Sequence, residues 1–180
     1  SGTSRPTSSF GQGYSLTAMQ ATSVFATIAN NGVRVKPSIL AGVVNESGKY
    51  TPAAANESTR VLSEQTAINM RAMMENVVSK NGTAPSAAIN GYRVAGKTGT
   101  AQVYSLNAKN YNHGATPEFL RDHALYVVFA PAENPKIAIA MIVENAGFGA
   151  AHAAPIARRA LDYYLEGRWP KEVPEWKNAP

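Results

Sequence analysis

The sequence has no cysteine, which excludes disulfide bonds, thiolate metal ligands and a cysteine nucleophile. It has no apolar run that approaches the roughly 18 residues of a membrane-spanning helix. The polar stretch at residues 1–9 does not have the pattern of a signal peptide. We therefore expect any export signal or membrane anchor of the parent protein to lie outside these 180 residues.

A run of basic residues is absent too. The 17 lysines and arginines are scattered and only Arg158 and Arg159 are adjacent, although the formal net charge is +5. Because nucleic-acid-binding proteins gather their basic residues into a patch, we expect no nucleic-acid partner, and only a mild attraction to anionic polymers or membrane surfaces stays open. The histidines, His113, His123 and His152, show no metal-ligand spacing, so we expect neither a metal nor another cofactor.

What the sequence does contain is enough apolar material for one globular domain, with 44% hydrophobic and 16% charged residues. Apolar residues at helical spacing predict a buried helix that begins at Ser15 or Thr17 and ends at Asn31-Gly32. A second amphipathic helix should begin at Ser63 and end at Asn81-Gly82.

Extended segments and a last helix complete the pattern. The expected extended segments are 33–44, 50–51, 91–103, 123–130 and 135–144. The last two are nearly continuously apolar, which predicts burial on both faces, and a hairpin turn joins them. Residues 52–59 should form a loop, and Tyr104–Arg121, long for a structureless loop, a functional flap or lid. A helix should run from about Ala151 to Glu166, where Pro155 is tolerable only in the first turn.

This order of elements predicts the fold class. A helix, extended segments, a second helix, three strands and a last helix are typical of an α+β domain, in which helices cover an antiparallel β-sheet. Residues 1–167 are predicted to form this domain. Residues 168–180, with three prolines and two tryptophans, are predicted to form an irregular C-terminal tail.

The most unusual stretch is Val94–Val103, VAGKTGTAQV. At its centre, Gly96–Thr100 combines one cation, two hydroxyls and two glycines within a strand-like run. Such residues suit a strand edge that receives an anionic ligand better than they suit a core. The alternative interpretation, from these residues alone, is a surface strand with ordinary threonines.

Three segments resemble the C-terminal part of class B penicillin-binding proteins, the peptidoglycan D,D-transpeptidases. They are Phe10–Gln20 (FGQGYSLTAMQ), Tyr92–Gln102 (YRVAGKTGTAQ) and Leu120–Gly147. The second contains the Lys-Thr-Gly motif that this group shares with serine β-lactamases. The first two are closer to division-type members and the third to elongation-type members. The resemblance implies a partial transpeptidase domain that lacks the subdomain of the nucleophile.

The resemblance also implies a chemistry for the Lys-Thr-Gly strand. In this family a serine attacks the D-Ala-D-Ala carbonyl of a stem peptide and forms an acyl-enzyme. Lys97 would supply positive charge and contact the serine of the second motif. Thr98 and Thr100 would offer hydroxyls to the substrate carboxylate, and Gly99 would allow close approach of the backbone. The backbone N–H of Thr100 would donate to the oxyanion, and the substrate would lie along the strand. Since side chains alternate along a strand, Lys97 and Thr98 reach one cleft only if the strand is an edge or bends.

The residues that would start this reaction are missing. No Ser-x-x-Lys or Thr-x-x-Lys string occurs in the sequence. Two Ser-x-Asn strings occur, but Ser79-Lys80-Asn81 ends a predicted helix close to Lys97, and Ser105-Leu106-Asn107 follows Lys97 in the wrong order, so we interpret both as coincidental. Asp122-His123 could suggest part of a catalytic triad, but adjacent residues on a strand point apart, which favours a structural role.

The resemblance therefore implies a parent protein that is a penicillin-binding D,D-transpeptidase and cross-links stem peptides in cell-wall synthesis. Peptidoglycan stem peptide and β-lactams are its expected ligands. A SEDS-type glycosyltransferase and the missing N-terminal part of the transpeptidase are its expected partners. The expected location is the periplasmic or extracytoplasmic side of the bacterial inner membrane. We expect the 180-residue chain alone to be inactive. The alternatives are a serine β-lactamase or β-lactam sensor domain, and a non-catalytic fragment that binds peptidoglycan or a partner protein.

Overall fold

The computed structural model of the chain describes residues 15–103 and 116–167. Its elements are α2 (Ala18–Ala29), β1 (Val33–Val35), β2 (Gly42–Val44), β3 (Tyr50–Pro52), β4 (Ser58–Arg60), α3 (Glu64–Glu75), η1 (Asn76–Val78), η2 (Pro85–Ala87), β5 (Ala95–Ala101), η3 (Glu118–Leu120), β6 (His123–Ala130), β7 (Ile137–Val143) and α4 (Gly149–Glu166). The predicted order of helices and strands is therefore confirmed for these residues.

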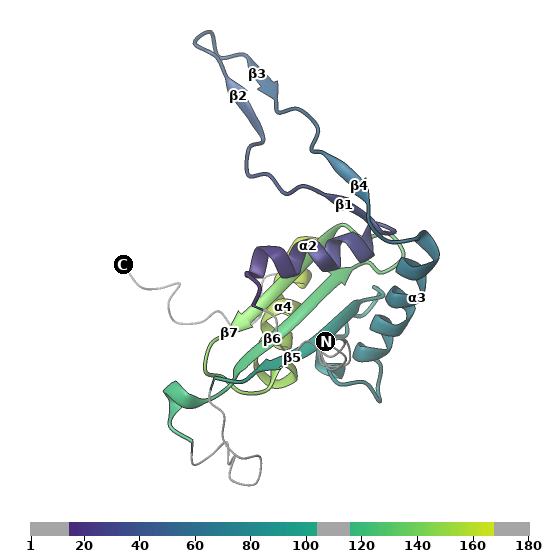
Figure 1. Ribbon diagram of the computed structural model, residues 1–180, viewed down its shortest axis with the longest axis vertical. Helices are drawn as coiled ribbons and strands as arrows, with labels where there is room; N and C mark the ends of the chain where they lie inside the picture. Colours follow the sequence, from purple (N-terminus) through teal and green to yellow (C-terminus); the bar gives the residue numbers. More distant parts are fainter. Residues whose placement is uncertain (1–14, 104–115, 168–180) are drawn as a thin grey trace, which may run out of the picture.

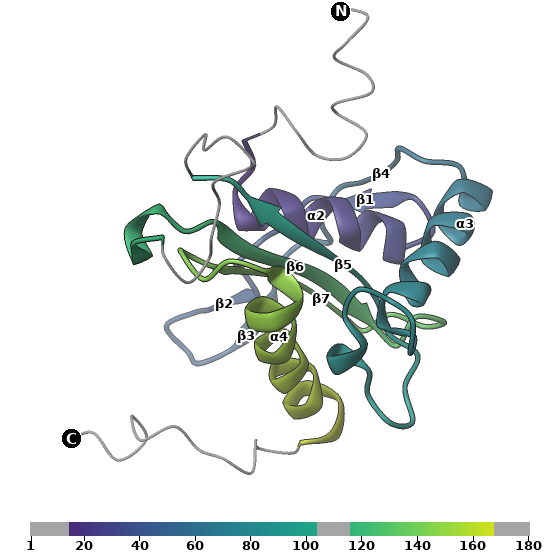
Figure 2. The same cartoon turned by 90° about the horizontal axis from the view of Figure 1, so that it is seen from below.

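A three-stranded antiparallel sheet of order β5-β6-β7 forms the centre of the molecule. Helices α2 and α4 cover opposite faces of this sheet, and α3 lies beside the end where β5 begins (Figure 2). The predicted α+β class, an antiparallel sheet covered by helices, is confirmed. Residues on β6 are half-buried or buried on both faces, as expected, whereas β7 is half-buried along most of its length because it is a sheet edge.

Two hydrophobic clusters hold these layers together. The cluster on the α4 side contains Tyr126 and Val128 from β6 and Leu161 from α4, all fully buried. The cluster on the other side joins Phe129 of β6 to residues of α2 and α3, including Met74. Because side chains alternate along β6, one strand supplies both clusters, and it thereby fixes the position of the motif strand beside it.

The ends of the helices follow local capping chemistry. Thr17 and Gln20 form a reciprocal capping box at the start of α2. The Ser63 hydroxyl accepts from the Thr66 N–H and caps α3. Asn31 and Gly32 follow α2 with positive φ angles of 51° and 86°. These predicted starts and this predicted stop are confirmed.

Three helix predictions need correction. Helix α2 was expected to be buried, but only Thr27, Ile28 and Ala29 are buried, because its last turn is the part that packs against β6 and α3. Met19 and Val24 are more than half exposed.

Helix α3 ends at Glu75, not at Asn81-Gly82, and a 3-10 turn follows. The Asn76 side chain bonds to the backbone, and the β-branched pair after it favours leaving the α-helix. Helix α4 begins at Gly149, so Pro155 lies in its second turn. The Ala151 carbonyl that loses its partner there belongs to an exposed residue, so water can satisfy it.

Residues 33–60 form an arm of two paired ladders, β1 with β4 and β2 with β3, which projects from the body (Figure 1). The prediction of a loop at 52–59 was wrong at both ends, because Pro52 pairs with Gly42 in β2 and Ser58–Arg60 pairs with β1. The backbone oxygen of Gly32 accepts from the N–H groups of Val61 and Leu62, at 2.9 and 3.1 Å, and closes the base of the arm. No residue of the arm is buried.

Candidate active site

The motif strand β5 lies at one edge of the sheet, since β6 is its only partner among the described residues. The predicted requirement that the strand carrying Lys97 and Thr98 be an edge strand or bend is therefore met by an edge strand. An edge strand leaves every second backbone N–H and C=O free to pair with an added strand. The segment Lys97–Thr100 thus presents both its side chains and its backbone to a ligand.

The side chains of β5 are divided between the two faces by its register with β6. Thr98 lies opposite Tyr126 and Thr100 opposite Ala124, on the face that α4 covers. Lys97 lies opposite Val127, on the face of α2 and α3. The hydroxyls of Thr98 and Thr100 therefore lie on one face of β5 and the ammonium group of Lys97 on the other, and both faces border the free edge of the strand.

Lys97 is exposed, and its Nζ donates a hydrogen bond to the backbone oxygen of Thr98, at 2.8 Å. Within residues 15–103 and 116–167, no carboxylate forms an ion pair with Lys97. The ammonium group keeps two further donors for other acceptors. The site accordingly holds a cation whose charge is available to an anionic ligand.

The sequence did not predict one residue that contacts the motif strand, Thr83. Its hydroxyl lies 3.2 Å from the hydroxyl of Thr98, across a turn that follows η1. Thr100, two residues further along β5, is exposed. The sequence shows Thr83 only as part of a loop, and no motif or spacing connects it to the strand. Only the packing of the η1 turn against β5 reveals the pair.

Two glycines set the close packing behind the strand. A Cβ at Gly99 would lie 3.2 Å from the Cβ of Leu125, so on that face the glycine makes room for the neighbouring strand. A Cβ at Gly149 would lie only 2.1 Å from the Leu125 oxygen and 2.6 Å from the Gly99 oxygen. The start of α4 therefore rests directly on the backbone of the motif strand.

Tyr126, opposite Thr98 on the neighbouring strand β6, has an unusual environment. Tyr126 is fully buried, and its hydroxyl has no hydrogen-bond partner among the described residues. Burial raises the pKa of its phenol well above the ordinary value, since the charged form would lack solvation. A Cβ at Gly96 would lie 2.5 Å from this hydroxyl, so the first glycine of the motif accommodates the tyrosine.

The other candidate groups have structural contacts. The N–H of Asn145 donates to Nδ1 of His123, at 2.9 Å, and the N–H of Gly147 donates to the backbone oxygen of Asp122, at 2.7 Å. Both bonds tie the start of β6 to the turn after β7. The Ser79 hydroxyl donates to the Asn76 oxygen, at 2.8 Å, in the turn after α3.

Several predictions fall wholly or partly on residues that the structure does not describe. These are the Ser105–Asn107 string, most of the proposed lid at 104–121, the glycine turn within Phe10–Gln20 and the tail at 168–180. In the described parts of the chain, no three acidic or histidine side chains cluster as metal ligands would. No helix there combines the length and hydropathy that crossing a bilayer requires.

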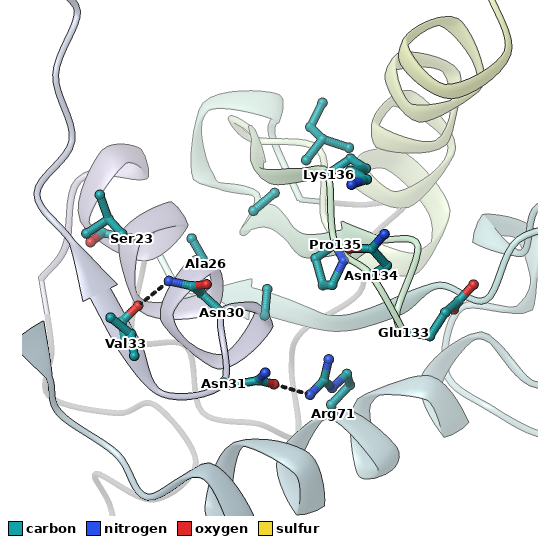
Figure 3. Close-up of a pocket in the computed structure, with 14 residues that line it drawn as sticks. Ser23, Ala26, Asn30, Asn31, Val33, Arg71, Glu133, Asn134, Pro135 and Lys136 are labelled. Atoms are coloured by element: carbon teal, nitrogen blue, oxygen red, sulfur yellow. Dashed lines mark hydrogen bonds between the residues drawn. The ribbon is translucent and has the colours of Figure 1, made fainter. Parts of the chain in front are cut away.

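A cavity of about 460 Å³ lies elsewhere, between α2, α3 and the turn that joins β6 to β7 (Figure 3). Arg71 of α3 crosses its floor and donates to Oδ1 of Asn31 and to the backbone oxygen of Ala132. These bonds tie the end of α2 to the β6–β7 turn. None of Lys97, Thr98, Gly99 and Thr100 lines this cavity.

Comparison with known proteins gives a consistent result. The family described as "Penicillin binding protein transpeptidase domain" matches residues 3–162. The chain is 38% identical over 167 residues to the peptidoglycan D,D-transpeptidase MrdA of Haemophilus influenzae, covering 89% of this chain and 26% of that protein. It is 38% identical over 144 residues to penicillin-binding protein PbpB of Mycobacterium tuberculosis, covering 75% of this chain and 20% of that protein. The chain thus spans about a quarter of the length of these relatives.

Solved structures agree with the sequence relatives. The imipenem acyl-enzyme of penicillin-binding protein A from M. tuberculosis superposes with a TM-score of 0.67 and 32% identity, covering 86% of this chain and 32% of that one. Penicillin-binding protein 3 from the same organism, complexed with aztreonam, gives a TM-score of 0.70 and 31% identity, covering 94% and 37%. At these identities the resemblance extends to both sequence and fold.

Proposed function

Because the chain belongs to the penicillin-binding protein transpeptidase domain family, we propose that it forms one wall of the active site of a peptidoglycan D,D-transpeptidase. The observation that carries the proposal is the place of Lys97–Thr100 on a free sheet edge. The opposite wall, with the nucleophilic serine, would come from polypeptide outside these 180 residues. The 180-residue chain by itself would be inactive.

The proposed reaction passes through a serine acyl-enzyme. The serine oxygen attacks the carbonyl carbon of the penultimate D-alanine, the C–N bond breaks, and the terminal D-alanine leaves as the amine with the serine proton. The amine of a second stem peptide then attacks the ester, which regenerates the serine. β-Lactams enter the same site, and their ring amide bond opens instead.

Residues of β5 would stabilise the charges in this reaction. Lys97 would exchange its bond to the Thr98 oxygen for the serine of the second motif, and its charge would favour the anionic transition state. Thr98 and Thr100 would donate to the substrate carboxylate. The Thr100 N–H would supply one oxyanion donor, a group whose loss typically costs about 3–4 kcal/mol. Gly99 would let the peptide backbone approach the strand.

The proposal includes the location of the full-length protein and a partner enzyme. The substrate of the full-length protein, the peptidoglycan stem peptide, lies outside the cytoplasmic membrane, so the site would face the periplasmic or extracytoplasmic side. Cross-linking acts on newly polymerised glycan strands, and a SEDS-type glycosyltransferase would supply them.

Labelling with a fluorescent penicillin tests the proposal. Two proteins are compared, the 180-residue chain and the same chain extended by the region encoded upstream of Ser1. We expect no label on the first and stoichiometric label on the second, with a variant lacking the upstream Ser-x-x-Lys serine as the control. Label on the short chain would contradict the need for an outside nucleophile, and a folded extended chain without label would contradict the transpeptidase assignment. Rapid hydrolysis of the penicillin by the extended chain would favour the β-lactamase alternative.

A further inference from the structure

The turn between η1 and η2 brings a second hydroxyl to the motif strand. Thr83 and Thr98 are 15 residues apart in sequence, and their side-chain oxygens are 3.2 Å apart. We infer that Thr83 is a positioning residue, which orients the Thr98 hydroxyl toward the carboxylate of the ligand. This inference rests on the proposed function, in which Thr98 binds that carboxylate.

The backbone around Thr83 is fixed on both sides. A Cβ at Gly82 would lie 2.2 Å from the backbone oxygen of Val77, so the turn can close only around a glycine. Ala84 is fully buried, and its N–H donates to the same Val77 oxygen, at 2.9 Å. Thr83 is exposed between these two anchored neighbours, so its backbone is fixed in place, and its hydroxyl contacts Thr98.

The position of the Thr98 oxygen is fixed as well, but its proton is not. The register with β6 places Thr98 opposite Tyr126, and a β-branched side chain has a restricted χ1 angle. The hydroxyl hydrogen still rotates freely about the C–O bond. In the absence of ligand, either threonine can be the donor in the pair.

A bound carboxylate removes this ambiguity. An ionised carboxylate only accepts hydrogen bonds, so Thr98 must direct its single proton to the ligand. The bond between the two threonines can then persist only if Thr83 donates to Oγ1 of Thr98. This donation polarises the Thr98 hydroxyl and strengthens its bond to the anion. Thr83 therefore contributes to the recognition of a charged terminus without touching it.

The contribution should depend on the charge of the ligand. A hydrogen bond to a carboxylate is about twice as strong as one to a neutral acceptor such as an ester carbonyl. The orientation of the Thr98 proton consequently matters more for a free acid than for its methyl ester. Thr83 would thus help the site to select ligands that end in a free carboxylate.

The test uses the chain extended by its upstream region and measures second-order acylation rates with benzylpenicillin and with its methyl ester. Thr83→Val removes the hydroxyl and keeps the shape, and Thr83→Ser keeps the hydroxyl. For T83V we expect a roughly three- to tenfold slower reaction with the acid, the range for loss of one hydrogen bond, and less than a twofold change with the ester. T83S should react like the parent. Thr83→Ala serves as a second variant without the hydroxyl if T83V melts early.

The outcomes distinguish a failure of the inferred role of Thr83 from a failure of the proposed function. Equal slowing with acid and ester would indicate a general structural role for Thr83 and overturn the inference, as would unchanged rates in T83V or a loss in T83S equal to that in T83V. In all these cases the extended chain without substitution is acylated, and the proposed function stands. A folded parent protein that reacts with neither compound would instead overturn the proposed function, and the inference with it.

Discussion

Replacement of Tyr126 by phenylalanine should stabilise the chain. The hydroxyl is fully buried and has no partner among the described residues, so it loses its bonds to water on folding and gains none in return. An unsatisfied buried polar group costs about 1–3 kcal/mol. Phenylalanine removes that cost and leaves a gap of only one oxygen atom beside Gly96. We expect the free energy of unfolding to rise by about 1 kcal/mol or more.

Urea unfolding of the 180-residue chain measures this gain. Each kcal/mol should raise the midpoint by about 0.3–1 M with an unchanged slope, because the surface exposed on unfolding is the same. Gly96→Ala in both backgrounds serves as a matched control. The added methyl would lie 2.5 Å from the hydroxyl oxygen and 2.9 Å from the Val127 oxygen. Its penalty, typically about 1–3 kcal/mol for overpacking, should therefore be smaller beside phenylalanine but not vanish.

The pH dependence of unfolding gives an independent check on the same group. Burial raises the pKa of Tyr126 in the folded state, whereas the unfolded phenol titrates near its ordinary value of about 10. Above that pH the unfolded state loses a proton that the folded state keeps, so this tyrosine makes stability fall as the pH rises. The advantage of Y126F should accordingly grow above about pH 10. A variant that is 1 kcal/mol or more less stable at neutral pH, or an advantage that shrinks at high pH, would refute the reasoning about the hydroxyl.

Two further predictions concern the motif strand and the helix α4 that packs against it. In the chain extended by its upstream region, Lys97→Ala should lower the acylation rate at least tenfold, because the proposed site loses its cation. The control Lys136→Ala, on an exposed turn, should leave the rate unchanged. Equal acylation rates for the two variants would contradict a role of Lys97 in the site. Gly149→Ala should destabilise the 180-residue chain by about 1–3 kcal/mol in urea unfolding, because its Cβ would lie 2.1 Å from the Leu125 oxygen. Ala151→Ser, at an exposed position of α4, is the control. An equally small loss of stability in both variants would contradict the close packing of α4 on β5.

The features that the sequence predicted correctly are those with a local cause. Thr17 and Ser63 cap the helices because a hydroxyl placed just before a helix satisfies a free N–H, whatever the rest of the chain does. The apolar run 123–130 forms the central strand because both of its faces are covered. The alternation of side chains along β5 requires an edge position or a bend, and the strand order meets this requirement with an edge.

The features that the sequence did not predict depend on partners distant along the chain. Ser58–Arg60 is polar and exposed, and only its pairing with β1 makes it a strand. Thr83 contacts Thr98 because a turn 15 residues upstream of Thr98 packs beside β5. The residues around Gly149 in the sequence do not show that a glycine is required there. The requirement follows from the backbone oxygens of Leu125 and Gly99, which leave no room for a Cβ. Such contacts are visible only once the chain is folded in three dimensions.

The arm has a consequence for how this domain tolerates change. The chain leaves the body after Gly32 and returns at Val61 and Leu62, so its two ends are already joined by hydrogen bonds before the arm begins. The arm contributes no buried residue to either cluster. A loop whose ends are held together can be lengthened at a small entropic cost, about 0.6 kcal/mol for each doubling. The turn around Gly48 is exposed, and a Cβ at Gly48 would meet no atom beyond its chain neighbours within 4 Å, so foreign sequence can be inserted beside Gly48, whose own φ of 80° favours keeping the glycine. The arm is thus a module that evolution can resize while the sheet and its motif strand stay unchanged.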